Sequence, residues 1–182
     1  MRSIVFSILL FCHVLVVGPV AMAQPAQGAS SEKDHGWEFG AHLGTVLPDQ
    51  VEGVSEIFYS SGFYAGYPIG DSDIAFWEGG ITTGDDEGVK WSQGVLGARV
   101  GVPIDSLLGI VFIGLDGTQY EASGVAVKLH LGTHVGGGFM TQLAGNLWLR
   151  TDMRMVFNPG ATMHINLGFV FRFPRSGGGG GN

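Results

Sequence analysis

The sequence predicts an all-β fold in which eight antiparallel strands follow one another up and down and close into a barrel. First, eight runs of about nine to thirteen residues place apolar side chains at every second position, as strands do. Second, the linkers between these runs are too short to hold a crossover helix. Third, the two faces of most runs differ strongly, and closing such a sheet removes its exposed edges.

The first four runs end at residues that favour turns. The run 36–47 alternates from Trp37 onward and stops at Pro48. The run 57–69 ends before the turn sequence GDSD, and the run 74–83 ends before the loop sequence GDDEG. A fourth run, KWSQGVLGARVGV, sets apolar residues against glycine and arginine, and the turn sequence PIDS follows it.

The last four runs complete the barrel. The run 107–115 is apolar on both parities, and we expect the polar residues 116–123 after it to form a loop. The run 124–136 alternates cleanly, and the glycine-rich sequence GGFMTQLAG after it reads as a turn. The run 146–157 and the final run 163–173 follow, joined by the turn sequence NPGAT.

The ends of the chain do not share this pattern. Arg2 precedes the apolar stretch 4–17, which is short for a membrane-spanning helix, and the sequence AMA before Gln24 fits a leader cleavage site. The sole cysteine, Cys12, lies in this leader, so we expect a mature chain without thiols or disulfides. The predicted parts are a signal peptide (1–23), a flexible periplasmic lead-in (24–35), the barrel (36–173) and a disordered Gly-rich tail (174–182).

Composition excludes several classes of function. The formal net charge of −7 argues against nucleic acid as a partner. The 32 glycines disfavour long helices. The sequences GGGGG and HVGGGF are not phosphate-binding loops, because no Lys-Ser or Lys-Thr pair follows either of them. We therefore expect no cofactor.

A metal site is also not expected. Four histidines share the parity of the small and polar residues, namely His42, His130, His134 and His164. Imidazole binds zinc and copper well. Their strands are spread around the predicted barrel at different heights, so we predict that they do not converge on one ion.

Two kinds of barrel fit the alternation. A soluble lipocalin-like barrel would bury the apolar face, whereas a membrane barrel would turn it to lipid and fill its lumen with small and charged groups. The polar parity is rich in glycine and poor in charge, and runs of about ten residues match a tilted bilayer crossing. Aromatic residues gather near run ends, as Trp37, Phe39 and Tyr67 do, which is typical of interfacial girdles. These features favour a transmembrane β-barrel.

An exported, cysteine-free chain of eight runs that ends in Phe169-x-Phe171-x-Phe173 resembles the small outer-membrane β-barrels of Gram-negative bacteria, of the OmpA and OmpX type. The resemblance implies an outer-membrane location after export. It also implies that Phe169, Phe171 and Phe173 form the insertion signal read by the barrel-insertion machinery. In this family the aromatic residue is usually the last one, whereas the sequence PRSGGGGGN follows Phe173 here.

Charged residues on the inward parity should pair, because unpaired charge in a dry lumen is costly. Closure makes the first and last strands neighbours, so we predict an ion pair between Glu38 and Arg172. A second cluster is predicted from the sixth and seventh runs, with Arg99 and Glu78 as further candidates. Its members are Lys128, Arg150, Asp152 and Arg154.

With a periplasmic N-terminus, alternate loops face outside the cell. These loops, 48–56, 84–89, 116–123 and 158–162, contain Asp49, Glu52, Glu56, Asp85, Asp86, Glu87, Asp116 and Glu121. The simpler interpretation is a solvated surface. The alternative is that divalent cations bridge these carboxylates to lipopolysaccharide phosphates.

No serine or cysteine stands at a telling spacing from a histidine, so we do not expect an enzyme. The predicted function is structural or interfacial: membrane integrity, or contact of a monomer with outer-membrane lipid, lipopolysaccharide or the surroundings. The alternative is a narrow porin-like channel or a lipocalin-like carrier for small molecules.

Overall fold

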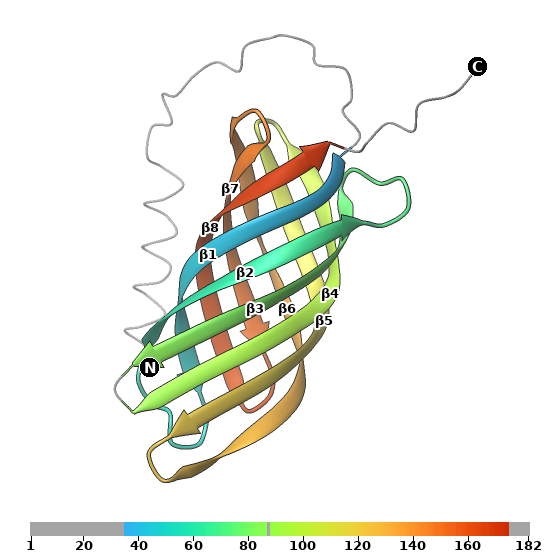
Figure 1. The fold of residues 1–182 in the computed structure, drawn as a ribbon. Coiled ribbons are helices and arrows are strands. Elements are labelled where there is room, and N and C mark those ends of the chain that lie inside the picture. Colours follow the sequence, from blue (N-terminus) through green and yellow to red (C-terminus); the bar gives the residue numbers. More distant parts are fainter. Residues whose placement is uncertain (1–34, 87, 175–182) are drawn as a thin grey trace, which may run out of the picture. The chain divides into compact units, whose positions relative to one another are not determined.

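The computed structural model describes residues 35–86 and 88–174, and the statements below refer to these residues. The strands are β1 His35–Asp49, β2 Phe58–Pro68, β3 Ala75–Asp86, β4 Val89–Ile104, β5 Leu107–Ala122, β6 Val125–Ala144, β7 Leu147–Val156 and β8 Ala161–Pro174 (Figure 1). The predicted signal peptide lies outside the described residues, as do 24–34 of the predicted lead-in and 175–182 of the predicted tail.

The strands form a closed barrel in which each strand pairs with the next and β8 returns to β1. The closing pair is antiparallel and runs from His35 opposite Pro174 to Asp49 opposite Ala161. The predicted antiparallel eight-stranded barrel is therefore confirmed. Following the predicted orientation, we call the end that holds His35 and Pro174 the periplasmic end, and the opposite end the outer end (Figure 1).

Short turns that contain glycine bound the longest strand, β6, at both ends. Gly124 has φ 79° in the turn between β5 and β6, and Gly145 has φ 51° in the turn between β6 and β7. Glycine adopts these left-handed conformations without a steric penalty. Between the two turns β6 runs for 20 residues.

The structure corrects two predicted loops, because residues 116–122 belong to β5 and residues 137–144 belong to β6. The glycines of β6 permit close packing instead of a turn. A Cβ atom on Gly136 would overlap the ring of Phe112, and one on Gly138 would overlap the backbone of Asp152. The polar residues of 116–122 resemble a loop in sequence because alternate ones point into a filled lumen.

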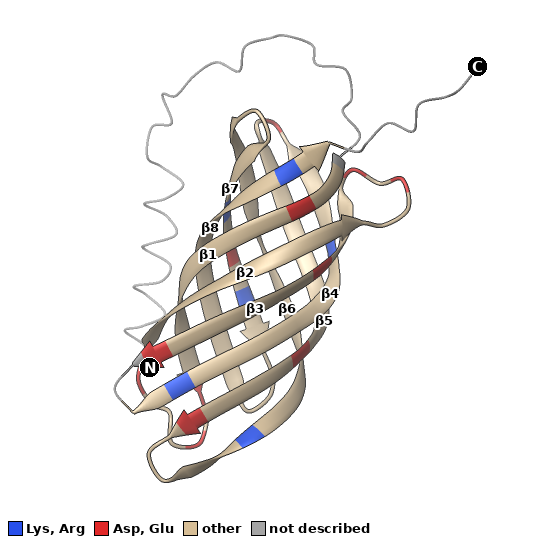
Figure 2. Cartoon of the chain, in the orientation of Figure 1, with Lys and Arg blue, Asp and Glu red and all other residues tan. Residues whose placement is uncertain are grey.

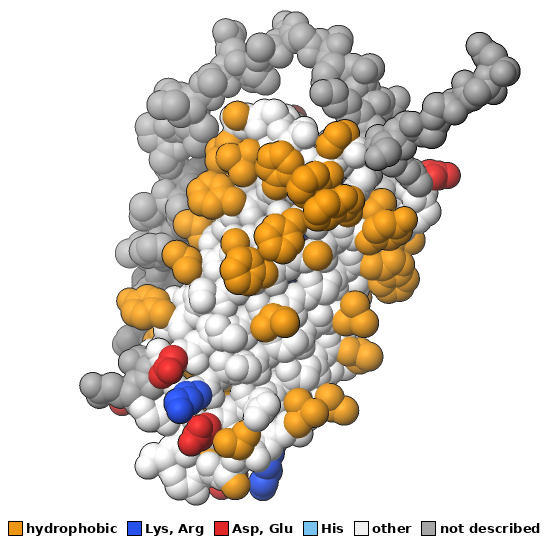
Figure 3. Space-filling view, in the orientation of Figure 1, with side chains coloured by type: hydrophobic (Ala, Val, Ile, Leu, Met, Phe, Trp, Pro, Cys, Tyr) orange, Lys and Arg blue, Asp and Glu red, His pale blue; other side chains and the backbone are white. Residues whose placement is uncertain are grey.

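The apolar face of the barrel lies outside. Leu43 and Leu131 are 71% and 72% exposed, whereas Arg99 and Arg150 are 1% and 2% exposed. Figure 3 shows hydrophobic side chains over the visible wall and the basic ones near the outer end. The lipocalin-like alternative is wrong, because it requires the opposite orientation. In the part of the chain that the structure describes, no helix is long and apolar enough to cross a membrane.

The wall of the barrel differs in height around its circumference. β6 has 20 residues and its neighbour β7 has 10. Their pairing begins at the outer end with His134 opposite Val156. Residues 125–132 of β6 therefore extend past the outer end of β7.

Candidate functional site

The candidate site is the lumen, which holds two groups of side chains. The first is the ion-pair network, whose members are Glu38, Glu78, Arg99, Arg150, Asp152, Arg154 and Arg172. The second is the outer stopper, whose members are Val46, Val51, Val54, Phe58, Val89, Trp91, Tyr120 and Ala122. Figure 2 shows charged residues on strands around the barrel, and those of the network are buried.

The periplasmic end of the ion-pair network is centred on Glu38. Arg172 Nε lies 2.7 Å from Glu38 Oε1, on the adjacent strand that closes the barrel. Arg99, on the far wall in β4, also contacts Glu38. The lumen is thus crossed by an ion pair between strands that are not neighbours, which the sequence pattern does not reveal.

The middle of the network is centred on Glu78. Arg150 Nη1 and Nη2 donate to the Glu78 carboxylate at 2.5 and 3.0 Å, in a bidentate pair. Arg99 Nε lies 3.2 Å from Glu78 Oε2, and Arg154 Nη2 lies 3.7 Å from Oε1. Arg150 Nε also donates to Asp152 Oδ2 at 2.6 Å. Glu78 therefore joins three arginines from two other strands, β4 and β7.

Aromatic rings complete the packing around the guanidinium groups. Arg150 lies 4.4 Å from the centre of the Tyr64 ring, and Arg172 lies 4.4 Å from that of Trp148. These cation–π contacts satisfy the faces of the guanidinium groups, which hydrogen bonds leave free. Glycines on neighbouring strands make room for the rings, since a Cβ atom on Gly40 would overlap Tyr64.

Little free space remains beside the network. A cavity of about 10 Å³ lies among side chains that include His42, Arg150 and Asp152. Such a volume holds roughly one water molecule. The side chains of the ion-pair network therefore fill this part of the lumen.

The outer stopper is the feature that sequence reasoning missed. The connection between β1 and β2 turns back into the mouth, where Val51 and Val54 are 6% and 5% exposed. Its tip reaches the opposite wall, because a Cβ atom on Gly53 would lie 3.4 Å from that of Ala122. Two valines in an otherwise acidic loop, and inward-parity apolar residues such as Trp91 at strand ends, were the available sequence signals.

The prediction for Lys128 is wrong. Its side chain is exposed, and Lys128 pairs in register with Tyr120 near the outer end of β5 and β6. The parity was correct, but this part of β6 lies beyond the end of β7 and above the filled lumen. Arg150, Asp152 and Arg154, which were predicted with it, lie together in the network.

The inward histidines make separate contacts. His42 Nε2 lies 3.2 Å from Thr82 Oγ1, and His134 Nδ1 lies 4.0 Å from Asp116 Oδ1. The His164 ring packs 6.2 Å from that of Trp91. Within residues 35–86 and 88–174, no group of three or more His, Cys, Asp or Glu residues could hold a metal ion.

The predicted acidic loops are only partly loops. Asp49 and Asp86 end strands β1 and β3, Glu52 and Glu56 are exposed between β1 and β2, and Asp85 is exposed on β3. Glu87 and the side chain of Asp86 lie outside the described residues. Asp116 corrects the prediction, because it is 4% exposed within β5 and accepts a hydrogen bond from Thr118.

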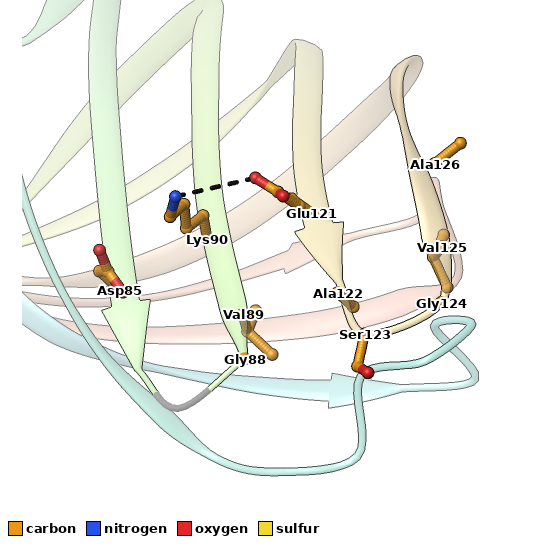
Figure 4. A pocket seen from close by; sticks show the side chains of 10 residues that line it. All are labelled: Asp85, Gly88, Val89, Lys90, Glu121, Ala122, Ser123, Gly124, Val125 and Ala126. Atoms are coloured by element: carbon orange, nitrogen blue, oxygen red, sulfur yellow. Dashed lines mark ion pairs between the residues drawn. The ribbon is translucent and has the colours of Figure 1, made fainter.

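Glu121 also lies on a strand, where it forms a rim ion pair. Its carboxylate is 3.9 Å from Lys90 Nζ, and both side chains are largely exposed. Figure 4 shows this pair beside Asp85 at a cavity of about 570 Å³, which the β3–β4 and β5–β6 turns border. An exposed pair of this kind contributes about 0–1 kcal/mol to stability.

The aromatic residues of the last strand lie at the periplasmic end. Phe169 and Phe171 are exposed on the outer wall. The Phe173 ring stacks on that of Trp37 on β1, with 3.8 Å between the ring centres. The centres of the Phe173 and Phe171 rings are 4.9 Å apart. Their role as an insertion signal stays a prediction.

Solved structures share this architecture. Neisserial surface protein A matches with a TM-score of 0.63 at 13% identity, over 75% of this chain and 97% of that one. The N-terminal β-barrel domain of Pseudomonas aeruginosa OprF gives 0.60 at 14% identity, over 76% and 99%. OprG from Pseudomonas aeruginosa gives 0.58 at 12% identity, over 79% and 98%. The fold is that of the small outer-membrane β-barrels. No family model and no curated protein matches the sequence.

Proposed function

We propose that this protein is an outer-membrane β-barrel with a structural and interfacial role and a lumen that does not conduct. The observation that carries the proposal is the filled lumen. The ion-pair network closes its middle, where a cavity of about 10 Å³ remains, and the outer stopper closes its mouth. A channel would need a continuous aqueous path, which larger barrels provide.

The outer wall supports a location in lipid. Apolar side chains such as Leu96, Ile113 and Leu167 are exposed around the barrel. In water, an apolar surface of this extent would drive aggregation, whereas hydrocarbon accepts it. Export by the predicted signal peptide, and insertion through the aromatic residues of β8, belong to the same proposal.

The rim at the outer end is proposed to contact lipopolysaccharide. Exposed carboxylates at this end include Glu52, Glu56, Asp85 and Glu121. Divalent cations would bridge them to lipid phosphates, since hard cations prefer oxygen ligands. Removal of calcium and magnesium should weaken co-purification of lipopolysaccharide with the protein. Unchanged association would remove this part of the proposal.

Planar-bilayer recording of the folded, purified protein tests the main proposal. We expect a silent membrane with no discrete current steps, because neither half of the lumen leaves an ion path. Stable steps that scale with protein insertion would instead support the narrow-channel alternative. Membrane fractionation and heat-modifiable migration on detergent gels should accompany the recording, with a folded band expected in the outer-membrane fraction.

A further inference from the structure

The outer mouth contains an apolar cup that the chain itself fills. The wall of the cup consists of Val46, Phe58, Val89, Trp91, Tyr120 and Ala122, contributed by β1, β2, β4 and β5. Trp91 forms its centre, because its ring lies 5.8 Å from that of Phe58 and 5.7 Å from that of Tyr120. Val51 and Val54 of the β1–β2 connection occupy the cup.

The two valines are held in the cup by apolar contact. Within the described residues, the hydrogen bond of this connection is internal, from Val54 N–H to the Val51 carbonyl at 3.2 Å, and none joins it to the wall of the cup. Apolar contacts are non-directional, so another apolar group of similar size can replace them. An apolar ligand of similar size can therefore take the place of Val51 and Val54, whereas directional hydrogen bonds would have to be matched atom by atom.

The floor of the cup is polar and has unused hydrogen-bonding capacity. Buried atoms without a hydrogen-bond partner in the described structure include Ser60 Oγ, Trp91 Nε1, Gln93 Oε1, Thr162 Oγ1 and His164 Nε2. The five side chains are between 0% and 6% exposed. Buried polar atoms of this kind ordinarily have partners, because leaving one unsatisfied is costly.

These atoms adjoin the wall of the cup at different heights, and Thr162 lies one inward position above His164 on β8. Ser60 and Gln93 are each one inward position below a wall residue, Phe58 on β2 and Trp91 on β4. His164 on β8 lies in register with Val46 on β1. The His164 ring also lies 6.2 Å from that of Trp91, so polar groups adjoin the apolar wall of the cup.

We propose that the outer mouth is a binding site for a small uncharged amphiphile. Its apolar body replaces Val51 and Val54 in the cup, and its hydroxyl or amide group hydrogen-bonds to the floor. None of the five floor atoms belongs to a carboxylate, a guanidinium or an ammonium group, so a neutral head group suits them. The inference goes beyond the proposed function and does not depend on contact with lipopolysaccharide.

The site opens only toward the outer end. Below the floor, the ion-pair network leaves about 10 Å³, so a ligand that enters by the mouth leaves by the mouth. The protein would thus capture the ligand at the cell surface without transporting it.

A reversible disulfide bond that holds the β1–β2 connection in the cup tests the proposal. The described residues contain no cysteine, and a Cβ atom on Gly53 would lie 3.4 Å from that of Ala122, close to the spacing of about 3.5–4.5 Å in disulfides. The same Cβ atom would lie 2.6 Å from Val125 Cγ2, so Gly53→Cys/Ala122→Cys is made together with Val125→Ala, and its oxidation then holds the β1–β2 connection in the cup. Ser61→Cys/Thr83→Cys, paired in register on the outer wall, is the matched control.

The probe is cyclohexanol, added to the full chain in lipid nanodiscs, with cyclohexanecarboxylate as the charged comparison. Binding is read from the NMR signal of Trp91 Nε1–H, which Trp91→Phe assigns. We expect a saturable shift for cyclohexanol in the reduced variant and in the control pair. The affinity for cyclohexanol should fall at least tenfold when the Gly53→Cys/Ala122→Cys variant is oxidised. Cyclohexanecarboxylate should bind the reduced variant at least tenfold more weakly than cyclohexanol does.

A second variant keeps the test decisive if the disulfide variant does not fold. Val51→Ser/Val54→Ser weakens the apolar contacts between the β1–β2 connection and the wall of the cup. It should therefore increase the affinity for cyclohexanol at least threefold. Equal shifts in the oxidised and reduced forms would overturn the proposal. The absence of a saturable shift in Val51→Ser/Val54→Ser would overturn it as well, and would leave the conductance test of the proposed function unaffected.

Discussion

The two halves of the lumen are closed by opposite chemistry. Toward the periplasmic end, Glu38 and Glu78 hold arginines from three strands in short, buried contacts. At the outer end, valines and aromatic rings close the mouth, and Val51 and Val54 come from a loop. Ion pairs are directional and costly to break once buried, whereas apolar contacts are adaptable. This difference supports the proposal that a ligand can displace the closure at the mouth, whereas the charged half stays closed.

The largest effect is expected at the centre of the charged half. Glu78→Leu removes the carboxylate that Arg99, Arg150 and Arg154 share. Uncompensated buried cations should lower the free energy of unfolding by about 3–5 kcal/mol. Denaturant titration in lipid vesicles, with Glu121→Gln at the rim as control, measures this cost. A loss no larger than that of the control would show that the network does not hold the lumen together.

The comparison assumes that the outer wall faces hydrocarbon. Leu167, at the middle of β8, is 55% exposed, so Leu167→Arg should cost about 2–4 kcal/mol, as a cation at the bilayer midplane does. Leu129, on the part of β6 that extends past β7, is the matched control. Leu129→Arg should cost only about 0–1 kcal/mol, as near an interface. Equal costs in vesicle unfolding would place both residues in the same environment.

A smaller effect is expected in the apolar half. Val54→Ala removes two buried methyl groups from the outer stopper, which should cost about 1–2 kcal/mol of unfolding free energy. Planar-bilayer recording of the same variant should stay silent, because the ion-pair network still closes the barrel. Current steps from Val54→Ala alone would mean that the stopper is the principal seal, and the contrast between the halves would fail.

The smallest effect is expected at the rim. Lys90→Gln disrupts an ion pair at 3.9 Å between two exposed side chains, and should change unfolding free energy by less than about 1 kcal/mol. Lys128→Gln should behave alike, since Lys128 is exposed above the lumen. If Lys128→Gln lowered the unfolding free energy by about 3 kcal/mol or more, as breaking a buried ion pair does, Lys128 would have to belong to the buried network.

The alternation of side chains was sufficient to predict the fold and the orientation of its faces. Closure also predicted Glu38 beside Arg172, because neighbours in a closed meander follow from strand order. Contacts across the lumen, such as Glu78 with Arg150, depend on strand stagger, which parity does not encode. Parity also does not encode the height of a residue along the barrel axis, which is why Lys128 was wrongly placed in the lumen network.

The outer stopper was missed for a different reason. Val51 and Val54 stand in a segment whose acidic residues made it read as a solvated loop. Its inward fold depends on the packing of Val51 and Val54 against residues of β1, β2, β4 and β5, which no local pattern predicts. Residues 116–122 were misread as a loop because inward positions of a filled barrel carry polar groups.

Single-cysteine labelling tests most directly whether the charged face is sealed inside and the apolar face lies in lipid. Asn166 is 6% exposed beside Asp152 in the lumen, and the next residue, Leu167, is 55% exposed on the wall. In folded protein in nanodiscs, Leu167→Cys should react with a lipid-soluble maleimide, and Asn166→Cys should resist both lipid-soluble and water-soluble reagents. Glu121→Cys at the rim serves as the positive control for the water-soluble reagent. Rapid labelling of Asn166→Cys by the water-soluble reagent would contradict the sealed lumen.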